Sequence, residues 1–554
     1  MPLARRIGES GYLVRTLDRL VYQNGSSLLV HIAGRALGDE PDVSHRPLAH
    51  ASPAQSGREL SDRCRRPFVF SDLRAVPFVC MEFKRQRDWK SGDRGVKKVC
   101  VQGLGFVGAA MAAAISKARD PGGSAAFEVV GIDLPTPPGR RRVDSINSGL
   151  FPFETADPAL ADAVRRGHSI GNLRATTDPV EYVDCDMVVV DVHLDVDFYT
   201  DPPSAKFQPF LAAINTLGAR LPIGALVLIE TTVPPGTTER LVVPELRKGL
   251  EARGLDPGGV LVAHSYERVM PGRDYLASIT NFWRVYAGHT EPAADACEHF
   301  LEKLINTRRY PLTRLKSTID SETAKLMENS FRAVNIAFVD EWSRFAERAG
   351  VDLASVIQAI KVRPTHQNIM RPGFGVGGYC LTKDPLLVRI GAREIFGFSD
   401  LAFTFCETAV LTNYQMPNGA IGILRTSLGD LANKRILLLG ATYREDVADT
   451  RFSPSIDFIT RVEAEGAAVD VHDPLVNWIE EIERPVMDDL PQACAYDAVV
   501  FAVAHEAYRQ LRPAEWLGRA RLLILDANFV LTSEQIAHFQ RAGSKVKVVG
   551  RGDL

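Results

Sequence analysis

The chain has 554 residues, a formal net charge of −3, 45% hydrophobic residues and 24% charged residues. A chain of this length is too long to fold around a single hydrophobic core. The nearly balanced charge gives no electrostatic reason to expect nucleic acid or a membrane as a partner. No apolar run reaches the roughly 18 to 20 residues that span a bilayer. The eight cysteines have no paired spacing, which favours reduced thiols over a disulfide framework. We therefore expect a soluble, cytoplasmic protein of roughly three or four domains, without a metal site.

Residues 1–95 differ from the rest of the chain. They are rich in arginine, as in RCRR at 63–66, and show no sustained hydrophobic periodicity. Acidic residues such as Glu9 and Asp18 argue against a transit peptide. We expect a disordered extension, with Met81 as an alternative start and a partner-binding tail as the competing interpretation.

An α/β unit is predicted for residues 96–310. Its first segment, VKKVCVQGLGFVG, predicts a buried strand, a glycine turn and the start of an Ala-rich helix. In this context G-x-G-x-x-G is typical of dinucleotide binding, because the glycines permit the tight turn, the approach of the pyrophosphate and close helix packing. The candidate cofactor-binding residues of this turn are Gly103, Gly105, Phe106, Val107 and Gly108.

The second strand of this unit, FEVVGID, ends at Asp133. A carboxylate at this place suits the ribose hydroxyls of NAD and would repel the 2′-phosphate of NADP, so we expect NAD as the cofactor. The arginines at 140–142 leave NADP as an alternative, although a solvated charge run is the simpler interpretation.

Two later strands of this unit lead into polar segments. The strand predicted at 225–229 is followed by ETTVPPGTTER, and the next one by YERVMPG. Thr231, Thr232 and Glu267 thus lie at carboxyl ends of strands, where α/β sheets bind ligands. Turn chemistry for the threonines and a solvated glutamate are the alternatives.

Residues 311–429 are predicted to be helical. Residues 317–349 contain no Gly or Pro, and within this run the helix start signals lie near Ser321 and a natural stop follows at Gly350. The length of this helix, about 50 Å, suits a spine between two domains. Three polar side chains share one face of this helix: Glu322, Lys325 and Asn329. An ordinary surface ion pair is the alternative to a functional role for this face.

The stretch RPGFGVGGYCLTKDP presents Cys380 behind a run of glycines. Glycines let the backbone approach a ligand, and the nearby Lys383 favours the thiolate that attacks electrophiles. A glycine turn with a buried small hydrophobe is the alternative interpretation.

A second α/β unit is predicted for residues 430–554. KRILLLG, AAVDVH, YDAVVFAVAH and RLLILDANFV supply its strands, but the dinucleotide glycines are missing, so it should bind something else. The predicted fold is therefore α/β, with two Rossmann-like doubly wound domains joined by a long central helix and a helical dimerisation region.

Several segments together carry a family resemblance. They are VQGLGFVG, INSGLFPFE, ETTVPPGTT, YERVMPG, ETAKLMENSFRAVNIA, PGFGVGGYCLTKDP, NYQMP and GATYREDVADTRFSPS. Over roughly residues 96–545 the chain resembles the nucleotide-sugar 6-dehydrogenases of the UDP-glucose/GDP-mannose dehydrogenase family. VNIA, ERVMPG and GVGGYC resemble the UDP-N-acetyl-D-mannosamine/UDP-N-acetylglucosamine dehydrogenase branch most closely. The resemblance implies that a homodimer or higher oligomer oxidises the C6 alcohol of a UDP-sugar with two NAD, for surface polysaccharide precursors.

The resemblance also assigns roles to individual residues. The catalytic roles fall to Cys380 as thioester-forming nucleophile, Lys325 as oxyanion stabiliser, Asp384 and Thr232 as water-positioning groups, Glu267 as acid–base group and Asn329 as support. The implied substrate contacts are Glu267, Arg268, Lys325, Asn329, Arg363, Phe374, Gly377, Lys383 and Arg444, with Arg363 reaching across a subunit contact. Arg451 would touch a cofactor phosphate.

Two positions depart from the family pattern. DVHLDVD at 191–197 has Leu194 and Asp195 in place of the usual Thr-Pro pair near the expected nicotinamide, and Asn528 stands where arginine is common. The alternatives are a UDP-glucose 6-dehydrogenase, a two-electron hydroxyacid dehydrogenase and a non-catalytic NAD-binding protein. Cys380 and the second α/β unit argue against the hydroxyacid dehydrogenase.

We predict that removing residues 1–80 leaves a soluble enzyme with unchanged activity, because the first buried strand is predicted to begin at Val96. Size-exclusion chromatography and the rate of NADH formation check this outcome. A truncated protein that aggregates would show that the extension is needed for folding.

Overall fold

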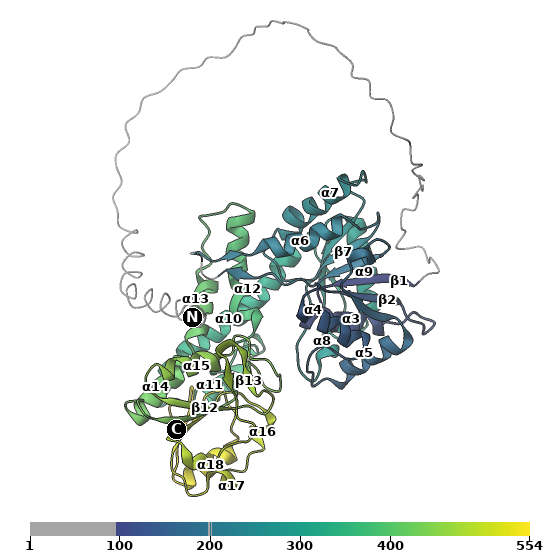
Figure 1. Ribbon diagram of the computed structural model, residues 1–554. Coiled ribbons are helices and arrows are strands. Elements are labelled where there is room, and N and C mark those ends of the chain that lie inside the picture. Colours follow the sequence, from purple (N-terminus) through teal and green to yellow (C-terminus); the bar gives the residue numbers. More distant parts are fainter. Residues whose placement is uncertain (1–95, 198–199, 201) are drawn as a thin grey trace, which may run out of the picture. The chain divides into compact units, whose positions relative to one another are not determined.

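The computed structural model describes residues 96–554 except 198, 199 and 201. The prediction made for residues 1–95 lies outside the described residues. Figure 1 shows an α/β unit at each end of the described chain, with helices between them in the sequence. The predicted α/β class, with two Rossmann-like sheets and a long central helix, is confirmed.

The first unit contains an eight-stranded sheet in the order β10-β9-β8-β7-β4-β1-β2-β3. Its strands are β1 (Lys97–Gln102), β2 (Phe127–Ile132), β3 (Leu173–Thr176), β4 (Met187–Val190), β7 (Leu226–Ile229), β8 (Leu261–His264), β9 (Val285–Gly288) and β10 (Thr313–Arg314). All neighbours are parallel except β8 and β9. The strand order reverses between β1 and β4, and doubly wound sheets bind ligands at the carboxyl ends of strands at such a point.

Helices cover both faces of this sheet, which explains why β4 and β7 are buried at every residue instead of alternating. The helices are α3 (Phe106–Lys117), α4 (Pro137–Asn147), α5 (Pro158–Ile170), α6 (Phe207–Gly218), α7 (Val243–Glu251), α8 (Tyr275–Thr280) and α9 (Glu291–Leu304). Two separate apolar clusters fill the unit, one containing Ile115 and Phe300 and the other containing Phe210 and Leu246. A short hairpin of β5 (Val196–Asp197) and β6 (Ser204–Ala205) follows β4.

The central helix α10 runs from Thr318 to Ala349. Its predicted end is confirmed, because Gly350 adopts the left-handed conformation, with φ 74°, and caps the helix. Its predicted start near Ser321 is wrong. Ser317 is the N-cap and forms a capping box with Asp320, so the helix begins about one turn earlier.

Further helices follow α10 before the second sheet. They are α11 (Leu353–Lys361), α12 (Tyr379–Ile390), α13 (Thr404–Gln415) and α14 (Pro417–Leu428). Helices α12 and α13 pack against α10 and against each other. Within the described ranges, no helix has the length and apolarity that crossing a membrane requires.

The second unit contains a parallel five-stranded sheet in the order β12-β11-β15-β16-β17. Its strands are β11 (Arg435–Leu439), β12 (Ala468–His472), β15 (Ala498–Phe501), β16 (Leu523–Asp526) and β17 (Lys545–Val548), and its helices are α15 (Pro454–Glu463), α16 (Glu506–Arg509), α17 (Pro513–Leu517) and α18 (Ser533–Arg541). A hairpin of β13 (Trp478–Ile479) and β14 (Arg484–Pro485) lies between β12 and β15 in the chain. The order again reverses next to the first strand, between β11 and β15, so this sheet has a ligand crevice of its own.

The glycine run before Cys380 packs against the second unit. A Cβ at Gly377 would lie 2.6 Å from both the Phe452 carbonyl oxygen and the Tyr443 Cβ. Gly378 is the N-cap of α12 and adopts φ 75°. The sequence led us to expect a ligand close to these glycines. In the structure it is the second unit of the protein that approaches them closely.

Candidate active site

The glycine turn after β1 has the geometry of a dinucleotide cradle. Gly103 adopts φ 93°, and a Cβ at Gly108 would lie 1.8 Å from the Gly103 carbonyl oxygen, so both positions require glycine. A Cβ at Gly105 would meet nothing within 4 Å, so open space lies in front of this residue. Gly105 is also the N-cap of α3, which leaves the first N–H groups of the helix to bind phosphate. These residues fit the pyrophosphate of NAD.

Asp133 is fixed beside this turn. Its Oδ2 accepts hydrogen bonds from Leu104 N–H at 3.3 Å and from Arg142 Nε at 2.7 Å, and its Oδ1 accepts one from Leu134 N–H at 2.7 Å. The carboxylate therefore stands at the end of β2 where an adenosine ribose fits. Arg142, which the sequence suggested to be part of a solvated charge run, is its ion-pair partner.

A buried ion pair joins α10 to the loop after β8. Lys325 Nζ lies 3.0 Å from Glu267 Oε1 and donates to the Glu267 carbonyl oxygen at 3.2 Å. Burial is the largest influence on both pKa values and opposes both charges, but it is outweighed. Glu267, Cys380 and Asp384 raise the pKa of Lys325, while Lys325 and the Val269 N–H lower the pKa of Glu267. At neutral pH the site therefore holds a fixed ammonium beside a fixed carboxylate.

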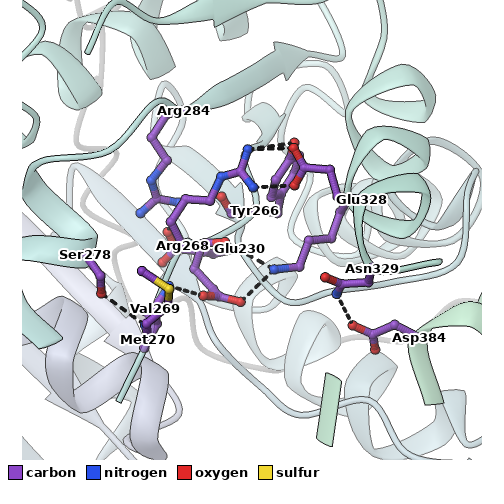
Figure 2. A network of polar contacts seen from close by, with 12 residues as sticks. Glu230, Tyr266, Arg268, Val269, Met270, Ser278, Arg284, Glu328, Asn329 and Asp384 are labelled. Atoms are coloured by element: carbon purple, nitrogen blue, oxygen red, sulfur yellow. Dashed lines mark hydrogen bonds and ion pairs between the residues drawn. The ribbon is translucent and has the colours of Figure 1, made fainter. Parts of the chain in front are cut away.

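Asp384 is anchored by two helices. Asn329 of α10 donates from Nδ2 to Asp384 Oδ2 at 2.7 Å (Figure 2). Lys383, its neighbour on α12, lies with Nζ 3.2 Å from Oδ1. All three residues are buried, so both carboxylate oxygens are held in place.

Cys380 lies in the first turn of α12 and is exposed. Protein atoms nevertheless surround the thiol on most sides, and this partial burial is the largest influence that raises its pKa to about 11. The charge of Asp384 acts in the same direction, and Lys325 acts against it. The thiol is therefore open to a substrate but protonated at neutral pH when no ligand is bound. The expectation that Lys383 favours the thiolate is wrong for this state, because burial and Asp384 outweigh the effect of Lys383.

The two threonines after β7 have different environments. The Thr231 hydroxyl lies 3.0 Å from the Val190 carbonyl oxygen and 2.8 Å from that of Val192, so it ties β7 to the end of β4. The Thr232 hydroxyl makes no hydrogen bond with any residue that the structure describes, and its side chain is half-buried. Thr232 is thus the threonine left for water or substrate.

Glu322 holds the loop that carries these threonines. Its carboxylate accepts hydrogen bonds from Gly236 N–H at 2.6 Å and from Thr238 N–H at 2.7 Å. Burial raises its pKa to about 8 against these hydrogen bonds. The alternative of a surface ion pair on this face of α10 is therefore wrong, because the face is buried.

Two of the predicted substrate arginines border the site. Arg268 forms a bidentate pair with Glu328 of α10, with one Nη2–Oε1 distance of 2.8 Å (Figure 2). Arg444 is exposed at the end of β11 and lines a cavity together with residues 270–274 of the first unit. Both units therefore contribute cations near the loop after β8.

Arg451 of the second unit reaches the glycine turn. It pairs with Asp449 at 2.6 and 2.8 Å, and its guanidinium carbon lies 4.4 Å from the centre of the Phe106 ring. The same carbon lies 4.8 Å from the centre of the Tyr379 ring. Arg451 thus lies between the start of α3 and the start of α12. Val107, the neighbour of Phe106, packs against the apolar cluster that contains Ile115 and Phe300.

Other residues singled out in the sequence lie apart from this cluster. Arg363 is exposed after α11, and its guanidinium has no hydrogen bond or ion pair within the described part of the chain. The Phe374 ring packs on Phe458 with centroids 5.4 Å apart, so only its backbone is left for a ligand. Asn528 Nδ2 donates to the Ala502 carbonyl oxygen at 3.1 Å.

Sequence reasoning missed a buried charged group behind Glu267. Glu230, directly after β7, lies 2.7 Å from Arg284, and both side chains are fully buried (Figure 2). Arg284 also donates to the Tyr266 carbonyl oxygen at 2.6 Å. Asp191 follows β4, and burial, followed by the charges of Glu230 and Glu267, raises its pKa. The available signal was that Asp191 and Glu230 each come directly after a strand.

The described residues contain no group of three or more His, Cys, Asp or Glu side chains placed to hold a metal ion. No disulfide joins any of the six cysteines among them.

Three segments of the chain match the domains of one family. Residues 97–305 match the NAD binding domain of the UDP-glucose/GDP-mannose dehydrogenase family, residues 320–414 its central domain and residues 437–533 its UDP binding domain.

Individual proteins are similar over most of the chain. A UDP-N-acetyl-D-mannosamine dehydrogenase from Pyrococcus horikoshii is 30% identical over 467 residues, which cover 82% of this chain and 100% of that protein. A UDP-N-acetyl-D-glucosamine 6-dehydrogenase from Salmonella typhi is 26% identical, covering 79% of this chain and 97% of that protein. The solved structure of a UDP-D-ManNAc dehydrogenase from Pyrococcus horikoshii aligns with a TM-score of 0.69 and 27% identity, over 82% of this chain and 100% of that one.

We predict that Cys380 of the ligand-free protein reacts slowly with iodoacetamide at neutral pH. Its rate should rise about tenfold per pH unit towards a pKa of about 11, because only the thiolate attacks. Asp384→Asn should lower this pKa and speed the reaction at a given pH, whereas Lys325→Met should raise it and slow the reaction. Mass spectrometry of the Cys380 peptide gives the rates, and a wild-type rate that levels off near pH 8 would contradict the assignment.

Proposed function

Because the chain belongs to the UDP-glucose/GDP-mannose dehydrogenase family, we propose that it oxidises the C6 hydroxymethyl group of a UDP-N-acetylhexosamine to the uronate. The first oxidation gives an aldehyde, and the second gives a thioester on Cys380. NAD would be the hydride acceptor in both. The names of the relatives from Pyrococcus horikoshii and Salmonella typhi support this class of sugar. The product would serve surface polysaccharide synthesis, and the lack of disulfides among the described cysteines favours the reducing cytoplasm as the location of the protein.

The observation that carries this proposal is the accessible Cys380 thiol beside two fixed charges of opposite sign. Lys325 and Asp384 both act on its pKa, and both are buried and hydrogen-bonded. A primary alcohol passes through an aldehyde on its way to a carboxylate. A nucleophile that binds the aldehyde carbon keeps it in the site for the second oxidation.

The charged residues of the site have distinct tasks in this chemistry. The Lys325 ammonium stabilises negative charge on the C6 oxygen, because a fixed cation in a partly dry site needs no reorganisation. Glu267 assists the acid–base chemistry by holding Lys325 in place and keeping it charged. Asp384 and Thr232 orient the water that releases the acid, and Asn329 fixes Asp384.

The second unit holds the nucleotide end of the substrate. It matches the UDP binding domain of the family, and its sheet has a crevice at the carboxyl ends of β11 and β15. Arg444 lies exposed after β11, where it can pair with the diphosphate, and Arg268 and Lys383 would contact the sugar. Arg451 lies close enough to the glycine turn to touch a phosphate of NAD.

A stripe of exposed apolar side chains along α10 favours a homodimer. Its members are Met327, Phe331, Phe338, Trp342 and Phe345. Exposed aromatic side chains in such a row are typical of surfaces that another protein covers. A second copy of this chain would cover the stripe in a dimer or in a larger oligomer built from it, and the exposed Arg363 would reach the neighbouring site.

We predict that Phe338→Glu combined with Trp342→Glu converts the protein to a monomer in analytical ultracentrifugation, because two buried charges would cost more than the contact gains. Ile170→Glu, which changes a similarly exposed side chain at the end of α5, should leave the oligomer intact. A wild-type protein that sediments as a monomer would contradict the proposed dimer.

We predict that Cys380→Ser still binds UDP-sugar and NAD but loses uronate formation, because a serine alkoxide is far less accessible than a thiolate near neutral pH. Calorimetry measures binding, and chromatography of the products measures the uronate. A serine variant that makes uronate at the wild-type rate would contradict the thioester mechanism.

Wild-type enzyme should produce two NADH per sugar, with UDP-N-acetylhexosamines turned over faster than UDP-glucose. One NADH per sugar would favour a two-electron dehydrogenase.

A further inference from the structure

His193 lies where the NAD crevice meets the helix of the nucleophile. It follows β4 at the reversal point of the first sheet, in the segment that departs from the family pattern. Its ring stands edge-on to the Tyr379 ring, with centroids 4.8 Å apart and planes at 75°. Tyr379 directly precedes Cys380 at the start of α12.

Asp195 orients the His193 imidazole. His193 Nε2 lies 2.8 Å from Asp195 Oδ1, so Nε2–H donates to the carboxylate and Nδ1 is left as the basic nitrogen. Nδ1 has no hydrogen-bond partner among the described residues, and the side chain is 49% exposed. The basic nitrogen is thus fixed in orientation and open to water.

The charges that face His193 come from two segments. Burial is the largest influence on its pKa, and it acts with Lys383 of α12 to lower that pKa, while Asp195 and Asp384 act to raise it. The net direction is downward, so the imidazole is neutral at pH 7 and can accept a proton. Arg451 of the second unit lies over the Tyr379 ring, which His193 also contacts.

The other acid–base groups of the site are engaged. Glu267 is paired with Lys325 and accepts a further hydrogen bond from Val269 N–H. Both oxygens of Asp384 already accept hydrogen bonds. Asp384 can therefore orient a water molecule, but a separate group is needed to take the proton of that water.

We propose that His193, oriented by Asp195, is the general base and then the general acid that releases the product from Cys380. This step rests on the thioester of the proposed function. His193 Nδ1 takes a proton from a water molecule as the water oxygen bonds to the acyl carbon. The carbon–sulfur bond then breaks, and the imidazolium returns its proton to the departing sulfur. The thioester and water thus become the free thiol and a carboxylic acid, which loses its own proton to solvent.

The step can be tested without cofactor by acetylating Cys380 with p-nitrophenyl acetate. Mass spectrometry of the Cys380 peptide follows both the addition of the acetyl group and its loss. In His193→Gln the acetyl group should be lost about 100-fold more slowly than in wild type, which is the lower end for general base catalysis. The rate at which iodoacetamide alkylates Cys380 should be the same in His193→Gln as in wild type. His168→Gln, which alters an exposed histidine of α5, should behave as wild type.

The pH profile separates a proton-transfer role from a structural one. In wild type, the rate of acetyl loss should rise with pH around a midpoint below the ordinary imidazole pKa of about 6.5. Asp195→Asn removes a charge that raises this pKa, so the midpoint should move to lower pH and the maximal rate should fall.

Different outcomes test the role of Cys380 as nucleophile and the role of His193 as general base. If Cys380 takes up no acetyl group even at an alkaline pH at which iodoacetamide alkylates it, the nucleophile of the proposed function is wrong and the role of His193 falls with it. If acetyl-Cys380 forms but His193→Gln loses the group at the wild-type rate, only the role of His193 is overturned.

Discussion

The buried ion pair of Lys325 and Glu267 is the contact on which the site depends. It joins the central helix to the loop after β8, with a distance of 3.0 Å between Nζ and Oε1. Removing one partner of such a pair leaves an unpaired buried charge, which costs roughly 3–5 kcal/mol. The same ammonium, together with Lys383, acts against the rise in the pKa of the Cys380 thiol. One contact therefore serves both the packing of α10 on the first sheet and the electrostatic environment of the proposed nucleophile.

Helix α10 distributes this constraint over three segments of the chain. Glu322, Lys325 and Asn329 point from one face of the helix because their spacing follows its turn. Glu322 holds the loop after β7, Lys325 holds the loop after β8, and Asn329 holds Asp384 on α12. A buried polar face of this kind fixes relative positions as well as contributing stability, since each polar group must find its partner or lose its hydrogen bonds.

The parts of this fold that local sequence determines were predictable. The strand–glycine–helix unit around Gly103 and the stop of α10 at Gly350 depend on neighbours in the chain, and both were confirmed. The family resemblance supplied candidates such as Asn329, but its bond to Asp384 joins residues 55 apart, and no local pattern reports that distance. His193 was passed over for the same reason, because its significance arises only where the loop after β4 meets α12.

The glycine run before α12 ties the position of the thiol to the second sheet. Gly377 fits only because it has no side chain to strike Tyr443 and Phe452, and Arg451 rests on the Tyr379 ring. A chimeric enzyme that took its second half from a relative would therefore misplace the Cys380 thiol unless the segments 371–380 and 443–454 came from the same parent. Because these two segments pack against each other, a substitution in one changes the fit of the other. Substitutions in residues 443–454 are therefore expected to accumulate together with substitutions around the thiol.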